Sequence, residues 1–342
     1  MKYTNYIFSA GVLLILCLGI GWVYYSEQPS TPFPQEKYGE NNSSRYRQLV
    51  SDWSGVFKEN AVAEAYEQYL TYARELSYSE AHELSHIVGE ALYRKLGVQG
   101  IEVCTPDFGF GCYHGFSGTV LTEEGTAKTE SLVGACRKTE LGFFLGCMHG
   151  IGHGILAYLG SAELNTALSL CAPLQSGEAI GGCLGGIFME YNFNTMQSLD
   201  GIQLRPFDPS HPRFLCETTI SSAFRTACYY EIPSWWRASL ETLGYSSEEQ
   251  YRTIGAYCSA IEDVALRDIC ARGIGNVIGA VSSYEPTVMR ESCSFLSTEE
   301  GRTLCFVEAL GHLLQTEVGK ETLERLCKEK IIDYPAYCAI KE

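Results

Sequence analysis

Basic residues are scarce in this chain relative to acidic ones. There are 25 lysines and arginines against 41 aspartates and glutamates, which gives a formal net charge of −16. A surface this acidic repels phosphate backbones and anionic lipid headgroups. The composition therefore argues against nucleic-acid binding and against a polybasic membrane patch, although most carboxylates only keep a surface solvated.

Several motifs of binding and catalysis are also missing. No G-x-S-x-G nucleophile elbow occurs, and Gly273, Gly275 and Gly279 do not follow a strand pattern, so they form no dinucleotide-binding fingerprint. No C-x2-C pair occurs either, which argues against zinc knuckles. The abundant cysteines of this chain therefore need a different explanation.

The cysteines are the most regular feature of the sequence. Of the 15 cysteines, all except Cys17 fall into consecutive pairs, with ten or eleven residues between the partners in six pairs and seven residues in the first pair. An even number of cysteines at regular spacing in an exported chain is typical of a disulfide framework. The predicted disulfides are Cys104/Cys112, Cys136/Cys147, Cys171/Cys183, Cys216/Cys228, Cys258/Cys270, Cys293/Cys305 and Cys327/Cys338.

The start of the chain predicts export. Residues 6–25 carry no charge, and this run is long enough to span the hydrocarbon of a bilayer. Lys2 precedes the run and Glu27 follows it, which favours an N-terminus inside and the rest outside. A cleaved signal peptide is the alternative, but its apolar core is usually shorter, and no A-x-A-like cleavage site is present. The predicted segments are a transmembrane anchor (1–26), a flexible linker that contains prolines (27–48), and an extracytoplasmic ectodomain, periplasmic or at the cell surface (49–342).

The ectodomain is built from repeats. From Cys136 onward, the first cysteine of each pair recurs every 34 to 45 residues, an interval typical of a two-helix unit. An amphipathic stretch ends near the first cysteine, a short polar turn follows, and the second cysteine lies in the opening turns of another apolar stretch. This pattern predicts an all-α fold of about seven helical hairpins stapled by disulfides and arranged as a solenoid or a closed ring.

Five of the seven histidines share one register in these repeats. His114 and His149 lie two positions after the second cysteine of their units, and His153 lies six positions after it, one helical turn further on the same face. His82 and His86 have the same four-residue spacing in the cysteine-free segment before the first pair. Because stacked units present equivalent faces to one another, these side chains could converge.

Two histidines four residues apart on a helix form a bidentate metal clamp. The sequence therefore predicts His82 and His86, together with His149 and His153, as ligands of zinc or another divalent transition metal. Two other interpretations remain: the histidines could be hydrogen-bonded core residues near helix N-termini, or a metal-free acid–base pair.

The segment HELSH, residues 82–86, resembles the H-E-x-x-H helix of zinc metallopeptidases. That resemblance implies that Glu83 is a general base that polarises the attacking water, with His114 as an auxiliary ligand or base. Glu83 and His114 are thus the catalytic candidates. Leu92 stands where the metzincin branch has its third histidine, so a further ligand must come from elsewhere. The candidates for it are His114, His149, His153 and Glu190.

Two other local patterns carry predictions. Gly142, Gly146, Gly150 and Gly154 recur every four residues, which predicts either close backbone approach between helices or room beside the histidines for a substrate. In the segment CYYEIPSWWR, residues 228–237, the proline is expected to break or kink a helix. The two tryptophans that follow it are expected to lie partly in the core or to form an exposed aromatic contact patch.

Two functions are consistent with these patterns. The first is a membrane-anchored, exported protein with a histidine-cluster metal site, with metal-dependent hydrolysis as one use of that site. The second is a non-catalytic extracytoplasmic scaffold whose concave face binds a peptide or protein partner, as in many repeat proteins. The expected partners are the membrane, through the N-terminal helix, and a peptide or protein ligand.

Overall fold

The structure, a computed structural model, describes most of the chain after residue 43. The described ranges are 44–76, 78–139, 143–174, 180–196, 203–281, 285–315 and 317–329, together with Cys338. They all belong to one unit that spans Glu36–Glu342. The anchor predicted for residues 1–26 lies outside the described residues, and so does the predicted linker up to residue 43. The first described helix begins at Ser44, within the last residues of that linker segment.

The described residues form helices and no strand, which confirms the prediction of an all-α fold for this part of the chain. The α-helices are α2 (Ser44–Glu59), α3 (Val62–Ala73), α4 (Tyr78–Leu96), α5 (Gly111–Glu124), α6 (Thr129–Cys136), α7 (Phe144–Leu159), α8 (Leu164–Cys171), α9 (Gly182–Phe193), α10 (Arg225–Thr242), α11 (Ser247–Ser259), α12 (Val264–Val281), α13 (Pro286–Cys293), α14 (Glu299–Gly311) and α15 (Glu317–Lys328). The shorter turns include η1 (Gly97–Val103), the π-helical η5 (Leu215–Thr219) and η7 (His312–Gln315).

All seven predicted disulfides are present in the structure. Their Cα–Cα distances run from 5.5 to 5.8 Å, within the range that a disulfide requires. Most first cysteines lie at the end of a short helix, as Cys136 does in α6, and the second lies in the opening turns of the next long helix, as Cys147 does in α7. Each disulfide thus fixes where one helix ends relative to where the next begins.

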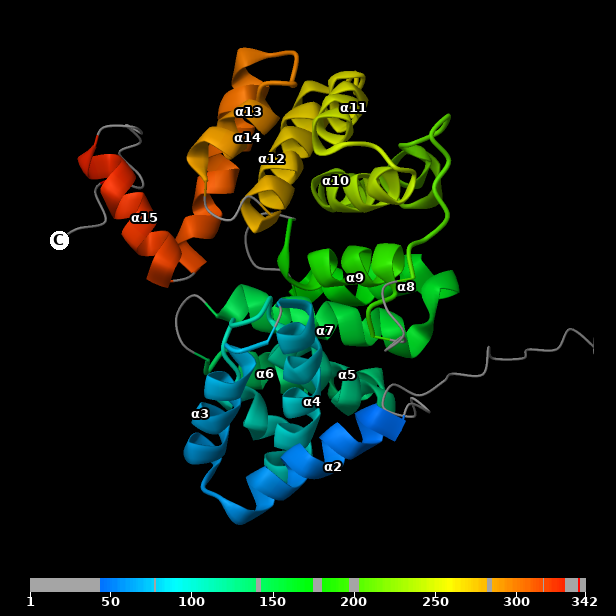
Figure 1. Ribbon diagram of the computed structural model, residues 1–342. Helices are drawn as coiled ribbons and strands as arrows, with labels where there is room; N and C mark the ends of the chain where they lie inside the picture. The colour runs from blue at the N-terminus through cyan, green and yellow to red at the C-terminus, as the bar shows by residue number, and fades with distance from the viewer. Residues whose placement is uncertain are drawn as a thin grey trace, which may run out of the picture. The chain divides into compact units, whose positions relative to one another are not determined.

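The long helices pack against one another in chain order. α4 contacts α5, α5 contacts α7, α7 contacts α9, and the series continues through α10, α12 and α14 (Figure 1). The shorter helices that carry the first cysteines, such as α6 and α8, contact the long helix on the other side of their disulfide. Neighbour-to-neighbour packing of this kind is what a helical-repeat architecture requires. The arrangement of the repeats as a solenoid or a closed ring stays a prediction.

Glycines allow the long helices to approach closely. A Cβ atom on Gly150 of α7 would lie 2.5 Å from the carbonyl oxygen of Tyr113 in α5, and one on Gly154 would lie 2.9 Å from that of Ser117. A Cβ atom on Gly115 of α5 would overlap the carbonyl oxygen of His86 in α4. The prediction of close backbone approach is confirmed at these positions, and Gly142 lies outside the described residues.

Of the two alternatives for the tryptophans of α10, the exposed patch is wrong, and the core placement holds for both tryptophans. Trp235 is 2% exposed and Trp236 is fully buried. Both indole N–H groups donate to backbone carbonyl oxygens, Trp235 to Arg205 at 3.1 Å and Trp236 to Pro212 at 2.9 Å. The helix continues through Pro233 instead of breaking there. Because both polar indole groups find partners in the segment 203–214, the aromatic pair belongs to the core.

The seven disulfides indicate an oxidising, extracytoplasmic environment. Within the part of the chain that the structure describes, no single helix is long and apolar enough to cross a membrane. One pair of helical segments, Phe144–Leu159 with Ser161–Leu174, has the length and composition for it, and this pair is bent by 116° at the break between them.

Candidate metal centre

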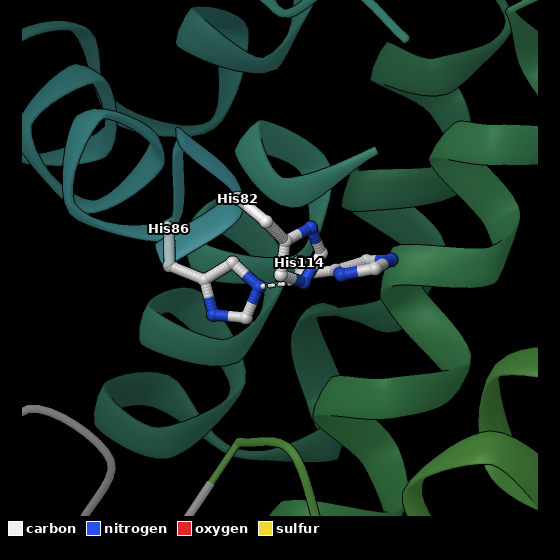
Figure 2. A group of neighbouring side chains, drawn as sticks. All are labelled: His82, His86 and His114. Carbon is white, nitrogen blue, oxygen red and sulfur yellow. Dashed lines mark hydrogen bonds between the residues drawn. The ribbon is translucent and has the colours of Figure 1, made fainter. Parts of the chain in front are cut away.

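Three consecutive long helices bring five imidazoles together. α4 supplies His82 and His86, α5 supplies His114, and α7 supplies His149 and His153. The donors form two triads that share His114. In each triad, one ring nitrogen per residue lies within 4.8 Å of the other two. Figure 2 shows the first triad, in which the two rings from α4 meet the ring of His114.

The convergence follows from the local structure of each helix. Side chains four residues apart lie on the same face, so α4 and α7 each present two rings side by side. Cys112 and Cys147 lie two residues before His114 and His149, and their disulfides fix the start of α5 and α7. Gly115, next to His114, removes the side chain that would hold α5 away from α4.

The two histidine-bearing helices α5 and α7 each end at a glycine with positive φ. Gly125, at the end of α5, has a φ of 76°, and Gly160, at the end of α7, has a φ of 86°. Each glycine N–H donates to a carbonyl oxygen of the last turn, that of Leu121 at 2.9 Å and that of Leu156 at 2.7 Å. A glycine is favoured there because side chains are strained at positive φ.

The paired imidazoles are separated by a distance suited to a shared ion. The Nε2 atoms of His82 and His86 are 3.1 Å apart, and so are those of His149 and His153. Two nitrogens that bind one tetrahedral zinc at its usual bond lengths are roughly 3.3 Å apart. The same separation also allows one neutral ring to donate to the other. Each pair is thus placed either to bind an ion or to hydrogen bond across the pair.

The other nitrogen of several rings is held by an acceptor of the protein. His82 Nδ1 lies 2.7 Å from the carbonyl oxygen of Phe108, and His153 Nδ1 lies 3.0 Å from a carboxylate oxygen of Glu190. The backbone of Gly182 hydrogen bonds to His149. A metal-binding histidine almost always donates its second N–H to a carbonyl or carboxylate in this way, which fixes its tautomer and orientation.

The loop before α5 is conformationally strained where it contacts the site. Phe108, Gly109 and Phe110 have φ angles of 52°, 66° and 62°. Such angles cost about 1–3 kcal/mol at a residue other than glycine, so the surrounding structure must hold the loop in place. The Cys104–Cys112 disulfide closes this loop. The strained segment aims the carbonyl of Phe108 at His82, which orients a candidate ligand.

His114 differs from the other four histidines. Its side chain is 2% exposed, and neither ring nitrogen has a hydrogen-bond partner within the described part of the chain. A neutral imidazole has one donor and one acceptor nitrogen, and leaving such groups buried without partners costs about 1–3 kcal/mol. Buried polar groups without partners are rare and need an explanation, and an ion that binds to the ring is one.

Burial keeps the imidazoles neutral. Desolvation lowers the pKa of His149 to about 4, and it lowers the pKa of His82 as well. The pKa values of His86, His114 and His153 are held well below their usual range, first by burial and then by the neighbouring imidazoles. Neutral imidazole is the form that binds metal ions.

Two buried carboxylates lie next to the α7 pair. Burial raises the pKa of Glu190 in α9 to about 7 and that of Glu231 in α10 to about 7. Glu190 accepts hydrogen bonds from Thr195 Oγ1 at 2.7 Å and from the backbone N–H of Met196 at 3.2 Å. Because the pKa of His153 is lowered, its contact with Glu190 is a hydrogen bond from a neutral ring rather than an ion pair.

Glu231 reaches the site because Gly185 has no side chain. A Cβ atom on Gly185 would lie 2.6 Å from a carboxylate oxygen of Glu231 and 3.3 Å from His149 Nδ1. The carboxylate of Glu231 is therefore a near neighbour of the His149 imidazole. Negative charge at Glu190 and Glu231 would offset the charge of a cation bound by the histidines.

The structure brings together all five histidines that the sequence indicated. Glu190, one of the candidates for a further ligand, instead serves as the hydrogen-bond partner of His153. Glu83 is half-buried on α4 and is not among the donors of either triad. Its role as a general base stays a prediction. The carbonyl of Phe108 and the carboxylate of Glu231 were not anticipated.

These features define an all-helical, disulfide-rich protein whose histidine clusters could hold a metal ion. In comparisons with known proteins, no family model, no curated protein and no solved structure matches the chain.

Proposed function

We propose that this protein is a membrane-anchored, extracytoplasmic metal-binding protein whose centre is formed by His82, His86, His114, His149 and His153. The observation that carries the proposal is the buried ring of His114, which lies among four other imidazoles with no hydrogen-bond partner in the described residues. A core histidine kept only for packing would have such partners. An ion that accepts the lone pair of the ring removes this cost.

The donor set favours zinc or another divalent transition metal. Imidazole nitrogen suits zinc, copper, nickel and iron, whereas calcium and magnesium prefer oxygen ligands. The cysteines do not compete for the ion because all seven pairs are oxidised. The carboxylate of Glu190 supports His153, and negative charge at Glu190 and Glu231 would offset the charge of the cation.

Hydrolysis is the catalytic use of the centre that the sequence favours. His82 and His86 belong to the same triad, which they form with His114. The H-E-x-x-H pattern requires this, because both of its histidines bind the same ion. In this proposal Glu83 would act as the general base, and a bound ion would supply the activation of the attacking water. Residues 1–26 would tether the ectodomain to the membrane with the N-terminus inside.

The test uses the full-length chain, purified in detergent with its disulfides intact. Elemental analysis after exposure to zinc and desalting should find bound zinc. A His82→Ala/His86→Ala variant should lose at least one equivalent. The control is His211→Ala, because His211 is an exposed histidine paired with Asp208 outside the cluster, and this variant should bind as much zinc as the wild type. A chain that binds no zinc would contradict the proposal.

The hydrolytic role has a separate test. Glu83→Gln should retain its zinc, because the histidine ligands are unchanged, and should lose turnover of 4-nitrophenyl acetate and of a fluorogenic peptide mixture. A zinc-loaded wild type without turnover of either probe, or a Glu83→Gln variant with unchanged turnover, would contradict hydrolysis by Glu83 and leave the metal site in place.

A further inference from the structure

His114 belongs to both triads. Its ring centroid lies 5.4 Å from those of His82 and His86 on one side. It lies 5.4 Å from that of His149 and 4.4 Å from that of His153 on the other. Within the ranges that the structure describes, the donors fall into two groups of three and not into one group of five.

The ring of His114 has two nitrogens, and its neighbours are one pair of imidazoles from α4 and one pair from α7. In Figure 2 the ring of His114 begins beside that of His82 and extends away from the His82–His86 pair. One ion bound at one nitrogen would leave the other nitrogen buried without a partner, and buried polar groups without partners destabilise a protein. Two ions, one at each nitrogen, leave neither unpaired.

We propose that the centre holds two metal ions bridged by His114, one ion with His82 and His86 and the other with His149 and His153. This inference rests on the proposed metal-binding function and adds the number of ions and the role of the shared ring. A ring bound at both nitrogens carries no N–H proton, so His114 is an imidazolate in this state. The proton that it loses passes to solvent when the second ion binds.

The two triads offer equivalent ligand sets. Each has three imidazole nitrogens, which leaves one position of a tetrahedral zinc open for water or another ligand, as in catalytic zinc sites. The contacts beyond the ligands differ: the carbonyl of Phe108 orients His82, whereas a carboxylate orients His153. Carboxylate contacts raise ligand basicity, so the α7 site should bind the first ion more tightly.

The number of ions is tested by titrating the metal-free, full-length chain with zinc. The wild type should bind two ions per chain. The His82→Ala/His86→Ala and His149→Ala/His153→Ala variants should each bind one, and the His211→Ala control should bind two. One ion per chain in the wild type would overturn the two-ion centre and leave the proposed function standing. No bound zinc, or equal binding in all variants, would overturn both.

The bridge is tested by loading the chain with copper(II) and counting unpaired electrons by electron paramagnetic resonance. Two copper ions that share one imidazolate couple, so the wild type should show fewer spins than copper atoms at low temperature. A His114→Gln variant, with folding checked by circular dichroism, should show one spin for each copper that it binds. A wild type with two coppers and two independent spins would overturn the bridge without depending on any variant.

Discussion

Replacement of His114 by leucine is expected to have opposite effects on the metal-free and the metal-loaded protein. Leucine has a similar volume and no polar atoms, so it removes two buried nitrogens that lack partners in the described structure. Removing buried polar groups that have no partners raises the free energy of unfolding by about 1–3 kcal/mol. The metal-free His114→Leu variant should therefore unfold with a free energy about 1–3 kcal/mol higher than that of the wild type.

With zinc added, the wild type should become more stable than the His114→Leu variant. A ligand that binds only the folded state stabilises it by about 2.7 kcal/mol at one hundred times its dissociation constant. The wild type has His114 to complete both triads, whereas the leucine variant keeps only the pairs from α4 and α7. Zinc should therefore stabilise the wild type more than the variant, by enough to offset the advantage of leucine.

The assay is urea unfolding followed by circular dichroism, once with a chelator and once with excess zinc. His114→Gln is the matched control. Its amide leaves polar atoms in the same buried position, so the metal-free form should not gain the stability that leucine provides. If His114→Leu destabilised the metal-free protein by more than about 1 kcal/mol, the ring would have partners that satisfy its nitrogens, and the reasoning would fail.

Three further predictions concern the packing, the disulfides and the pH dependence. Gly115→Ala should destabilise the fold by about 1–3 kcal/mol in urea unfolding and reduce zinc binding, because the new Cβ overlaps the backbone of α4. Gly134→Ala, in α6 with open space around it, should be neutral or stabilising. The Cys136→Ala/Cys147→Ala variant should lose about 3 kcal/mol of stability in the same assay, because the disulfide closes a short loop in the unfolded chain. Without metal, the free energy of unfolding should fall as the pH decreases from about 6.5 to 4, because the buried imidazoles take up protons only on unfolding. His149, with its pKa lowered to about 4, contributes about 3 kcal/mol to this fall. The two buried glutamates with raised pKa oppose this trend, but five histidines outweigh them, and a stability that rises on acidification would contradict the assignment of neutral, buried rings.

The disulfide pairing and the helix ends could be predicted because they depend on short-range sequence. Two consecutive cysteines that flank the turn between two helices lie close enough to form a disulfide, as Cys136 and Cys147 do. Burial of both Trp235 and Trp236 was only partly predictable, because it depends on a segment about 25 to 30 residues away that accepts their N–H groups. Local patterns do not reveal such partners.

The convergence of the histidines was predictable for a similar reason. His114 and His149 occupy the same position after a disulfide cysteine, so equivalent helices present them to the same side. The groups that orient the ligands follow no such rule. The carbonyl of Phe108 depends on a strained loop, and Glu231 reaches the site only because Gly185 is small. Backbone strain and contacts between distant helices leave little signal in a single sequence.

The central claim is that imidazole nitrogens of this cluster bind a metal ion, and X-ray absorption at the zinc edge tests it most directly. The full-length protein loaded with one equivalent of zinc should show a first shell of nitrogen at about 2.0–2.1 Å, with the outer-shell scattering typical of imidazole rings. A first shell that contains sulfur, or oxygen without imidazole scattering, would contradict the account.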